Sequence, residues 1–141
     1  NCRVGEPETQ TIRMRLNSNL AKLCLATLDG TLNATRADWD PRPALGVVLA
    51  AGGYPDAYRK GDVIEGLDGA DSDTVKVFHA GTRDDDGQAV TSGGRVLCVT
   101  ALGDSVADAQ HRAYQAVSGV SWRDAYHRTD IGYRAVLREQ S

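Results

Sequence analysis

Residues 44–55 read ALGVVLAAGGYP, and this stretch decides the fold. Leu45 to Ala51 form a continuous apolar run that ends at a Gly-Gly pair and a Tyr-Pro pair. A short apolar run closed by such residues is typical of a strand buried on both faces and followed by a tight turn.

Further strands are predicted on the C-terminal side of this run. They cover residues 62–66, residues 75–79, where Val75, Val77 and His79 alternate, and residues 95–102. The Asp-Gly pair at residues 86–87 predicts a hairpin turn between two of the strands. A helix follows from Ser105, with Asp108 in capping-box spacing, and the tail is expected to add one helical turn and a short strand.

The residues before the apolar run are more polar. Residues 1–16 are interpreted as the end of a strand followed by a loop. Apolar residues at helical spacing predict a helix over residues 18–29, capped by Ser18 or Asn17 and closed by Gly30. Residues 31–43 contain two prolines and read as a linker, which Trp39 is expected to pin onto a neighbouring element.

The order of these elements is a helix, a linker, three to five antiparallel strands, a second helix and a tail. That order predicts an α+β fold. Residues 1–16 and the first helix are interpreted as the end of one unit, and residues 44–141 as a small α+β unit of their own.

Bulk composition narrows the class of protein. The 141 residues carry a formal net charge of −3 and have an estimated pI of about 5.5, which argues against nucleic acid as the main partner. No apolar run approaches the roughly 18 residues of a membrane span, so no membrane partner is expected. The three cysteines are far apart and lack a CxxC pair, which favours a reducing cytoplasm.

The first three residues include side chains that can bind a metal ion or an anion. Asn1 and Arg3 alternate by two, so on a strand both side chains point to the same face. An amide oxygen suits Mg²⁺, and a guanidinium suits phosphate or carboxylate. A solvated terminus is the simpler interpretation of so short a pattern.

Two glycine-containing stretches can face an anion. In SGGRV, Gly93 and Gly94 permit close backbone approach, and Arg95 can then clamp a phosphate. AGGYP at residues 51–55 is followed closely by Arg59 and Lys60. The alternatives are an ordinary hairpin with a surface arginine and an ordinary turn.

Other patterns carry little chemistry. The run DDDG at residues 84–87 lacks the remaining ligands of a calcium loop, and the three histidines show no metal-ligand spacing. No Ser-His-Asp, Cys-His or Walker signature is present. From the residues alone, the chain is an α+β domain with anion-binding loops as its candidate sites.

Taken in series, several stretches resemble the C-terminal third of the phosphoribosylamine–glycine ligase (glycinamide ribonucleotide synthetase) family of ATP-grasp enzymes. They are NCRVGEPETQ, GVVLAAGGYPDAYRKGDVI, VFHAGT, VTSGGRVLCVTALG and AYQAVSGVSW, and the resemblance covers essentially the whole chain. It implies that residues 1–40 end an ATP-grasp domain with its linker. Residues 41–141 would then form a small C-terminal domain with an antiparallel sheet or barrel-like arrangement and a packed helix.

The resemblance also implies a reaction in purine biosynthesis. ATP phosphorylates the carboxylate of glycine, and the amine of 5-phosphoribosylamine attacks the acyl phosphate to form an amide. The family motif Glu-x-Asn-x-Arg makes Asn1 a ligand of Mg²⁺ (or Mn²⁺) and Arg3 a catalytic residue. The motif's Glu would lie two residues upstream of Asn1, and here Glu6 and Val4 replace the family's usual Asp and Phe.

For the substrate site, the resemblance implies that Arg95, with Gly93 and Gly94, contacts the phosphate of phosphoribosylamine. Lys60 is a weaker candidate for the same contact. The start at Asn1 without Met leads us to expect that the N-terminal and ATP-grasp regions precede this chain in a longer cytoplasmic protein. Because the family's nucleotide-binding lysines and loops are absent, we expect no ligase activity from the chain alone.

Two alternatives stay open at this stage. The chain can be a free-standing, non-catalytic module or subunit that completes a partner ATP-grasp ligase. It can also be the tail of a carboxylase-type or formyltransferase-type ATP-grasp enzyme, although AGGYP and FHAGT speak against that interpretation.

Overall fold

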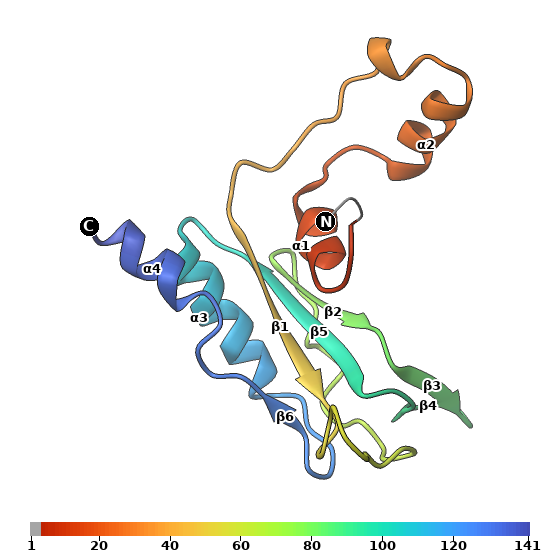
Figure 1. Ribbon diagram of the computed structural model, residues 1–141, viewed down its shortest axis with the longest axis vertical. Coiled ribbons are helices and arrows are strands. Elements are labelled where there is room, and N and C mark those ends of the chain that lie inside the picture. Colours follow the sequence, from red (N-terminus) through yellow and green to blue (C-terminus); the bar gives the residue numbers. More distant parts are fainter. Residues whose placement is uncertain (1–3) are drawn as a thin grey trace.

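The structure is a computed structural model that describes residues 4–141 (Figure 1). Within residues 4–141, four α-helices, one short 3₁₀-helix and six strands make an α+β fold, as the sequence predicts. In chain order they are α1 (Glu8–Arg15), α2 (Leu20–Leu28), η1 (Leu32–Ala34), β1 (Ala44–Ala50), β2 (Val75–His79), β3 (Thr82–Asp85), β4 (Gln88–Thr91), β5 (Arg95–Leu102), α3 (Val106–Val117), β6 (Tyr126–His127) and α4 (Tyr133–Glu139).

The main sheet has four antiparallel strands in the order β2-β5-β1-β6. Val99 of β5 stands opposite Val47 of β1 on one side and Val77 of β2 on the other. The described strands β2 and β6 form its two edges, so the sheet is open and the barrel-like alternative is wrong. The two-residue length of β6 leaves little strand with which to close a barrel.

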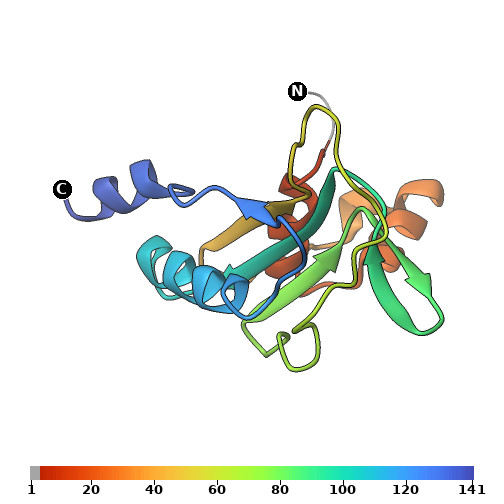
Figure 2. The ribbon, with the colours of Figure 1, turned by 90° about the horizontal axis from the view of Figure 1, so that it is seen from below.

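One face of the sheet carries the hydrophobic core. Alternation along the strands directs Leu45, Val47 and Leu49 to the same side. They are buried against α3, whose apolar stripe is Ala109, Ala113 and Val117. The small alanines let the helix lie close to the sheet, and Figure 2 shows α3 running along it.

Helix α1 contacts β1 and β5 from the other face. A side chain added at Gly46 would meet Thr11 of α1 at 3.3 Å and Cys98 at 3.2 Å. The glycine therefore marks a close approach between α1 and the sheet. This helix is a correction, because residues 1–16 are interpreted above as a strand end and a loop.

Strands β3 and β4 form a separate hairpin, with Asp86 and Gly87 at its turn as predicted. Both turn residues have positive φ, 51° and 84°, which is the geometry of a type I′ turn. The strand predicted at 62–66 is wrong. That segment forms only isolated bridges, from Val63 to Val90 and from Glu65 to Ser121.

Helix α2 lies where the sequence predicts a helix, but its cap differs. Asn19, rather than Ser18 or Asn17, accepts hydrogen bonds from the amides of Ala21 and Lys22. Ser18 instead accepts a bond from the amide of Asp38 and so ties the linker to the start of the helix.

The linker also pairs with the end of α1. Trp39 bridges to Leu16, although its side chain stays exposed. Among residues 4–141, no helix combines the length and the apolar character needed to cross a bilayer.

Candidate functional site

The predicted glycine turn faces a long loop. This glycine turn, residues 92–94, joins β4 to β5. Residues 51–62 follow β1 and run beside the turn. The Ala51 amide donates to the Gly94 carbonyl at 2.8 Å, and the Gly61 amide donates to the Thr91 carbonyl at 2.7 Å. The loop is therefore fixed at both ends to the turn, while its middle projects from the sheet.

A side chain at either Gly93 or Gly94 would come too close to a neighbouring residue. The Gly93 amide donates to the Gly81 carbonyl at 2.9 Å, and an added Cβ at Gly93 would lie 3.0 Å from the Gly81 Cα. A Cβ at Gly94 would lie 2.2 Å from Cδ2 of Tyr54 and 3.1 Å from Cε1 of Tyr58. Tyrosine rings thus cover Gly94, and a direct contact of either glycine with a ligand stays a prediction.

Arg95 begins β5 directly after this turn. Its side chain is 45% exposed, and one guanidinium nitrogen lies 3.6 Å from a carboxylate oxygen of Glu6. A single contact of that length leaves other N–H groups of the guanidinium free to bind an anion. The pair also brings the segment before α1 to the glycine turn.

Lys60 lies on the facing loop. Its ammonium nitrogen is 5.8 Å from the centre of the Tyr58 ring, and the Tyr58 and Tyr54 rings meet edge to face at 6.1 Å. Arg59, in contrast, is paired with Asp62 at 3.1 Å. The structure therefore connects Lys60 and Arg95 through the two tyrosines that pack on Gly94.

The predicted metal ligand Asn1 and catalytic Arg3 lie outside the described residues. Within residues 4–141, no group of three or more His, Cys, Asp and Glu side chains is placed to hold a metal ion. The Mg²⁺ or Mn²⁺ ligand role of Asn1 stays a prediction.

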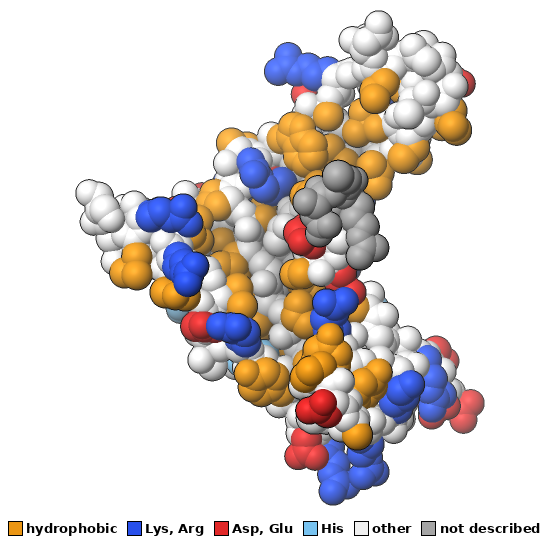
Figure 3. Space-filling view, viewed as in Figure 1, with side chains coloured by type: hydrophobic (Ala, Val, Ile, Leu, Met, Phe, Trp, Pro, Cys, Tyr) orange, Lys and Arg blue, Asp and Glu red, His pale blue; other side chains and the backbone are white. Residues whose placement is uncertain are grey.

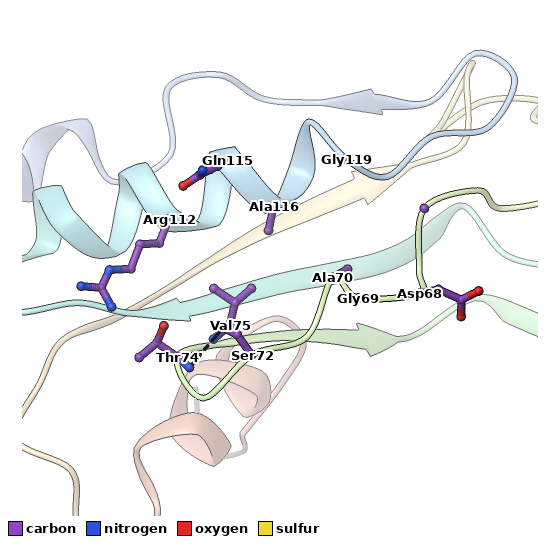
Figure 4. A pocket seen from close by; sticks show the side chains of 11 residues that line it. Asp68, Gly69, Ala70, Ser72, Thr74, Val75, Arg112, Gln115, Ala116 and Gly119 are labelled. Carbon is purple, nitrogen blue, oxygen red and sulfur yellow. Dashed lines mark hydrogen bonds between the residues drawn. The ribbon is translucent and has the colours of Figure 1, made fainter.

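A cavity of about 630 Å³ lies elsewhere, between α3 and residues 66–75 (Figure 4). Two charged residues, Asp68 and Arg112, line it, and Arg112 is held by Asp108 at 2.9 Å. The amide of Asp104 and the guanidinium of Arg112 together keep the pKa of Asp108 below its ordinary value. Of the predicted site residues that the structure describes, which are Lys60, Gly93, Gly94 and Arg95, none lines this cavity.

Sequence reasoning missed three residues of the candidate site. Tyr54 belongs to the AGGYP stretch at residues 51–55, for which a turn is the simpler interpretation, and Tyr58 follows three residues after it. Their packing on Gly94 joins positions some 40 residues apart. Glu6 is noted above only as a departure from the family motif. An aromatic residue directly after a glycine pair is the one local signal that points to such packing.

The comparisons with known proteins agree with one another. Residues 44–134 match the family described as phosphoribosylglycinamide synthetase, C domain. The chain is 62% identical over 141 residues to the phosphoribosylamine–glycine ligase of Allochromatium vinosum, and 57% identical over 142 residues to that of Escherichia coli O157:H7. It covers 100% of its own length in both comparisons and 33% of each relative.

A solved structure shows the same fold. The crystal structure of the phosphoribosylamine–glycine ligase of Thermotoga maritima matches 92% of this chain and 32% of that protein, with a TM-score of 0.71 and 34% identity. The chain thus spans about one third of the length of the relatives it matches, and it corresponds to their C-terminal third. This chain therefore belongs to the phosphoribosylglycinamide synthetase family, and its residues 44–134 are that family's C domain.

Proposed function

We propose that this chain is the C-terminal part of an ATP-dependent ligase that joins glycine to 5-phosphoribosylamine to make glycinamide ribonucleotide. The observation that carries the proposal is the 62% identity to a phosphoribosylamine–glycine ligase over every residue of the chain. The alternative, a free-standing module that completes a partner ligase, has no comparable observation in its favour.

The reaction needs a site for a phosphate monoester. ATP converts the glycine carboxylate to an acyl phosphate, and the substrate amine displaces the phosphate to form the amide. Holding the sugar phosphate near that centre turns a bimolecular encounter into an oriented one. Arg95 is suited to this task, because it is half exposed and engaged by one carboxylate at 3.6 Å only.

Lys60 is the second cation we assign to that phosphate. A dianion is held better by two positive groups than by one, and the Tyr58 ring keeps the Lys60 ammonium on the side of the loop that meets Gly94. Arg3 is assigned to the transferring phosphoryl group and Asn1 to the metal ion.

The remaining two thirds of such a ligase need a surface on which to pack. Leu25 and Leu28 of α2 are 57% and 82% exposed, and Leu32 of η1 is 45% exposed. Figure 3 shows apolar side chains gathered over this arm, away from the sheet. Such an exposed apolar surface fits our assignment of residues 1–40 to the end of an ATP-grasp domain that the longer protein completes.

The test compares two forms of the protein in one assay. The full-length ligase that contains this chain should form glycinamide ribonucleotide from phosphoribosylamine, glycine and ATP, with ADP released in equal amount. The 141-residue chain alone should give no turnover above background. No product from the full-length protein would overturn the ligase assignment, and turnover by the chain alone would show that the catalytic groups lie within it.

A further inference from the structure

Two aromatic rings pack between the hydrogen-bonded ends of the loop over residues 51–62. Inside it, the Tyr54 amide donates to the Ala51 carbonyl at 3.1 Å and the Asp56 amide donates to the Gly53 carbonyl at 2.9 Å. Among the described residues, neither tyrosine hydroxyl forms a hydrogen bond. What the two side chains contribute to the loop is therefore the packing of their rings.

The Tyr54 ring lies directly on the backbone of Gly94. The distances of 2.2 Å and 2.6 Å from an added Cβ to Tyr54 Cδ2 and Cε2 leave no room for a methyl group. The Tyr58 ring closes the contact from the side, at 3.1 Å from the same position. The two rings thus pack on the chain one residue before Arg95, whose own backbone is held in the ladder between β5 and β1.

The same rings fix the second cation. Tyr58 meets Tyr54 edge to face at 6.1 Å, and Lys60 lies over Tyr58 at 5.8 Å. One continuous contact then runs from Lys60 through Tyr58 and Tyr54 to Gly94, and the chain continues directly into Arg95. A change in either ring should move the two cations relative to each other.

The geometry points to Tyr54 and Tyr58 as positioning residues that set the spacing of Lys60 and Arg95 for a phosphate monoester dianion. This inference rests on the proposed function for the identity of the phosphate-bearing substrate. The rings act by packing, so phenylalanine should replace tyrosine at position 54, whereas alanine should not.

The kinetic test uses the full-length ligase. Tyr54→Ala should raise the KM for phosphoribosylamine at least about tenfold, while the KM values for ATP and glycine stay within about twofold, because a misplaced cation loses a charge-assisted contact to the phosphate. Tyr54→Phe should match the wild type. Tyr133→Ala is the control, since Tyr133 is similarly exposed, at 45% against 40%, and lies on α4.

Three results would overturn the inference. The first is a Tyr54→Ala variant that behaves like Tyr133→Ala. The second is an equal rise in all three KM values for Tyr54→Ala. The third is a Tyr54→Phe variant that loses as much as Tyr54→Ala. The last result would assign the effect to the hydroxyl group instead of to the ring.

A second measurement tests the packing without using the reaction. Gly94→Ala should lower the apparent Tm of the full-length protein by roughly 1 to 3 °C, because its methyl group collides with the Tyr54 ring. In the Tyr54→Ala background, Gly94→Ala should cost much less. Equal losses in Tm in both backgrounds would refute the contact. If the Tm loss is smaller in the Tyr54→Ala background but the wild-type protein has no ligase activity, the contact stands and only the proposed function is refuted.

Discussion

Asp40 is the residue at which the linker is fixed to the rest of the molecule. Its carboxylate accepts hydrogen bonds from the Arg42 amide at 2.9 Å and from the Arg42 guanidinium at 2.6 to 3.2 Å. Its backbone exchanges hydrogen bonds with Arg15 at the end of α1, since the Asp40 amide donates to the Arg15 carbonyl at 2.7 Å. One residue therefore joins the linker, α1 and the start of β1.

The charge of Asp40 makes stability depend on pH. The bidentate bond with Arg42 lowers the pKa of Asp40 from 3.8 to about 2. Because the folded state holds this proton less tightly than the unfolded chain does, the stabilisation is complete above the ordinary pKa and is lost as the pH falls from about 4 toward about 2. Asp40→Asn should thus lower the apparent Tm at pH 6 and make a progressively smaller difference below pH 4.

Measuring Tm against pH for the wild type and for Asp40→Asn checks this expectation. Asp38→Asn is the matched control, because Asp38 is exposed and its one ion pair, with Arg36, is 3.6 Å long. A Tm difference between Asp40→Asn and the wild type that stays constant from pH 6 to pH 2 would contradict the role of the Asp40 charge.

The sequence predicts some features of the glycine turn and of Arg95 but not others. The glycine pair before Arg95 indicates a close approach, and the structure confirms that side chains do not fit there. The sequence around Gly94 does not predict which residue packs against it, because Tyr54 lies 40 residues earlier in the chain. Whether Arg95 contacts a phosphate stays a prediction, because the packing explains the glycines but not the arginine.

At the scale of elements, α3 is capped from two directions. The Ser105 hydroxyl accepts a hydrogen bond from the Asp108 amide at 3.0 Å. Glu139, near the end of α4, accepts from the amides of Val106 and Ala107 at 2.7 Å and 3.2 Å. A carboxylate at the start of a helix also interacts favourably with the helix dipole, so α4 is held to α3 through its own terminal residues.

Removing the hydroxyl cap should destabilise the fold measurably. Ser105→Ala should lower the free energy of unfolding by about 1 kcal/mol, because the amide of Asp108 loses its acceptor at the helix start. Ser118→Ala is the control at the other end of the same helix, where the hydroxyl donates to the Gln115 carbonyl and satisfies no orphan amide. Denaturant unfolding of both variants gives the comparison, and equal losses would contradict the capping role.

The elements also show where sequence reasoning succeeds. Strands β1 and β5 are predicted because both are long and apolar, with glycines after β1 and on both sides of β5. Helix α3 is predicted because its cap and its apolar stripe agree. Helix α1 was missed because ETQTIRMR has no apolar face and buries no residue. Its end signals were nevertheless present, with Glu8 in the first turn and Arg13 and Arg15 in the last.

The segment at residues 62–66 shows the opposite error. Its apolar residues suit a strand, yet the neighbouring backbone groups are taken by two different partners. The Ile64 amide donates to the Ala89 carbonyl and the Glu65 amide to the Ser121 carbonyl. Local composition therefore indicated extended chain correctly but could not show that the pairing is divided between β4 and the residues after α3.

At the scale of the whole molecule, the sheet lies between α3 and α1, and α2 projects from it (Figure 1). The core accounts for the α3 side, where alternating residues of three strands are buried. The α2 arm lacks such burial, with Leu28 82% exposed. This uneven distribution of apolar surface is expected of a chain that spans about one third of its relatives' length.

The sequence predicted the α+β class, the central strands and the family, because these depend on long patterns that many residues share. It did not predict that the sheet is open, since closure depends on strand lengths at the edges and β6 has only two residues. Nor did it predict the contact between Glu6 and Arg95, which joins the N-terminal segment to a turn about 90 positions later in the chain.

The most direct test of the account is the effect of Arg95→Ala on the full-length ligase, with Arg83→Ala as a matched control at 50% side-chain exposure against 45%. The account predicts that Arg95→Ala raises the KM for phosphoribosylamine at least about tenfold and leaves the KM for ATP within about twofold, because one charge-assisted bond to the substrate phosphate is lost. Equal changes in the two KM values, or no change in either, would contradict the account and remove Arg95 from the substrate site.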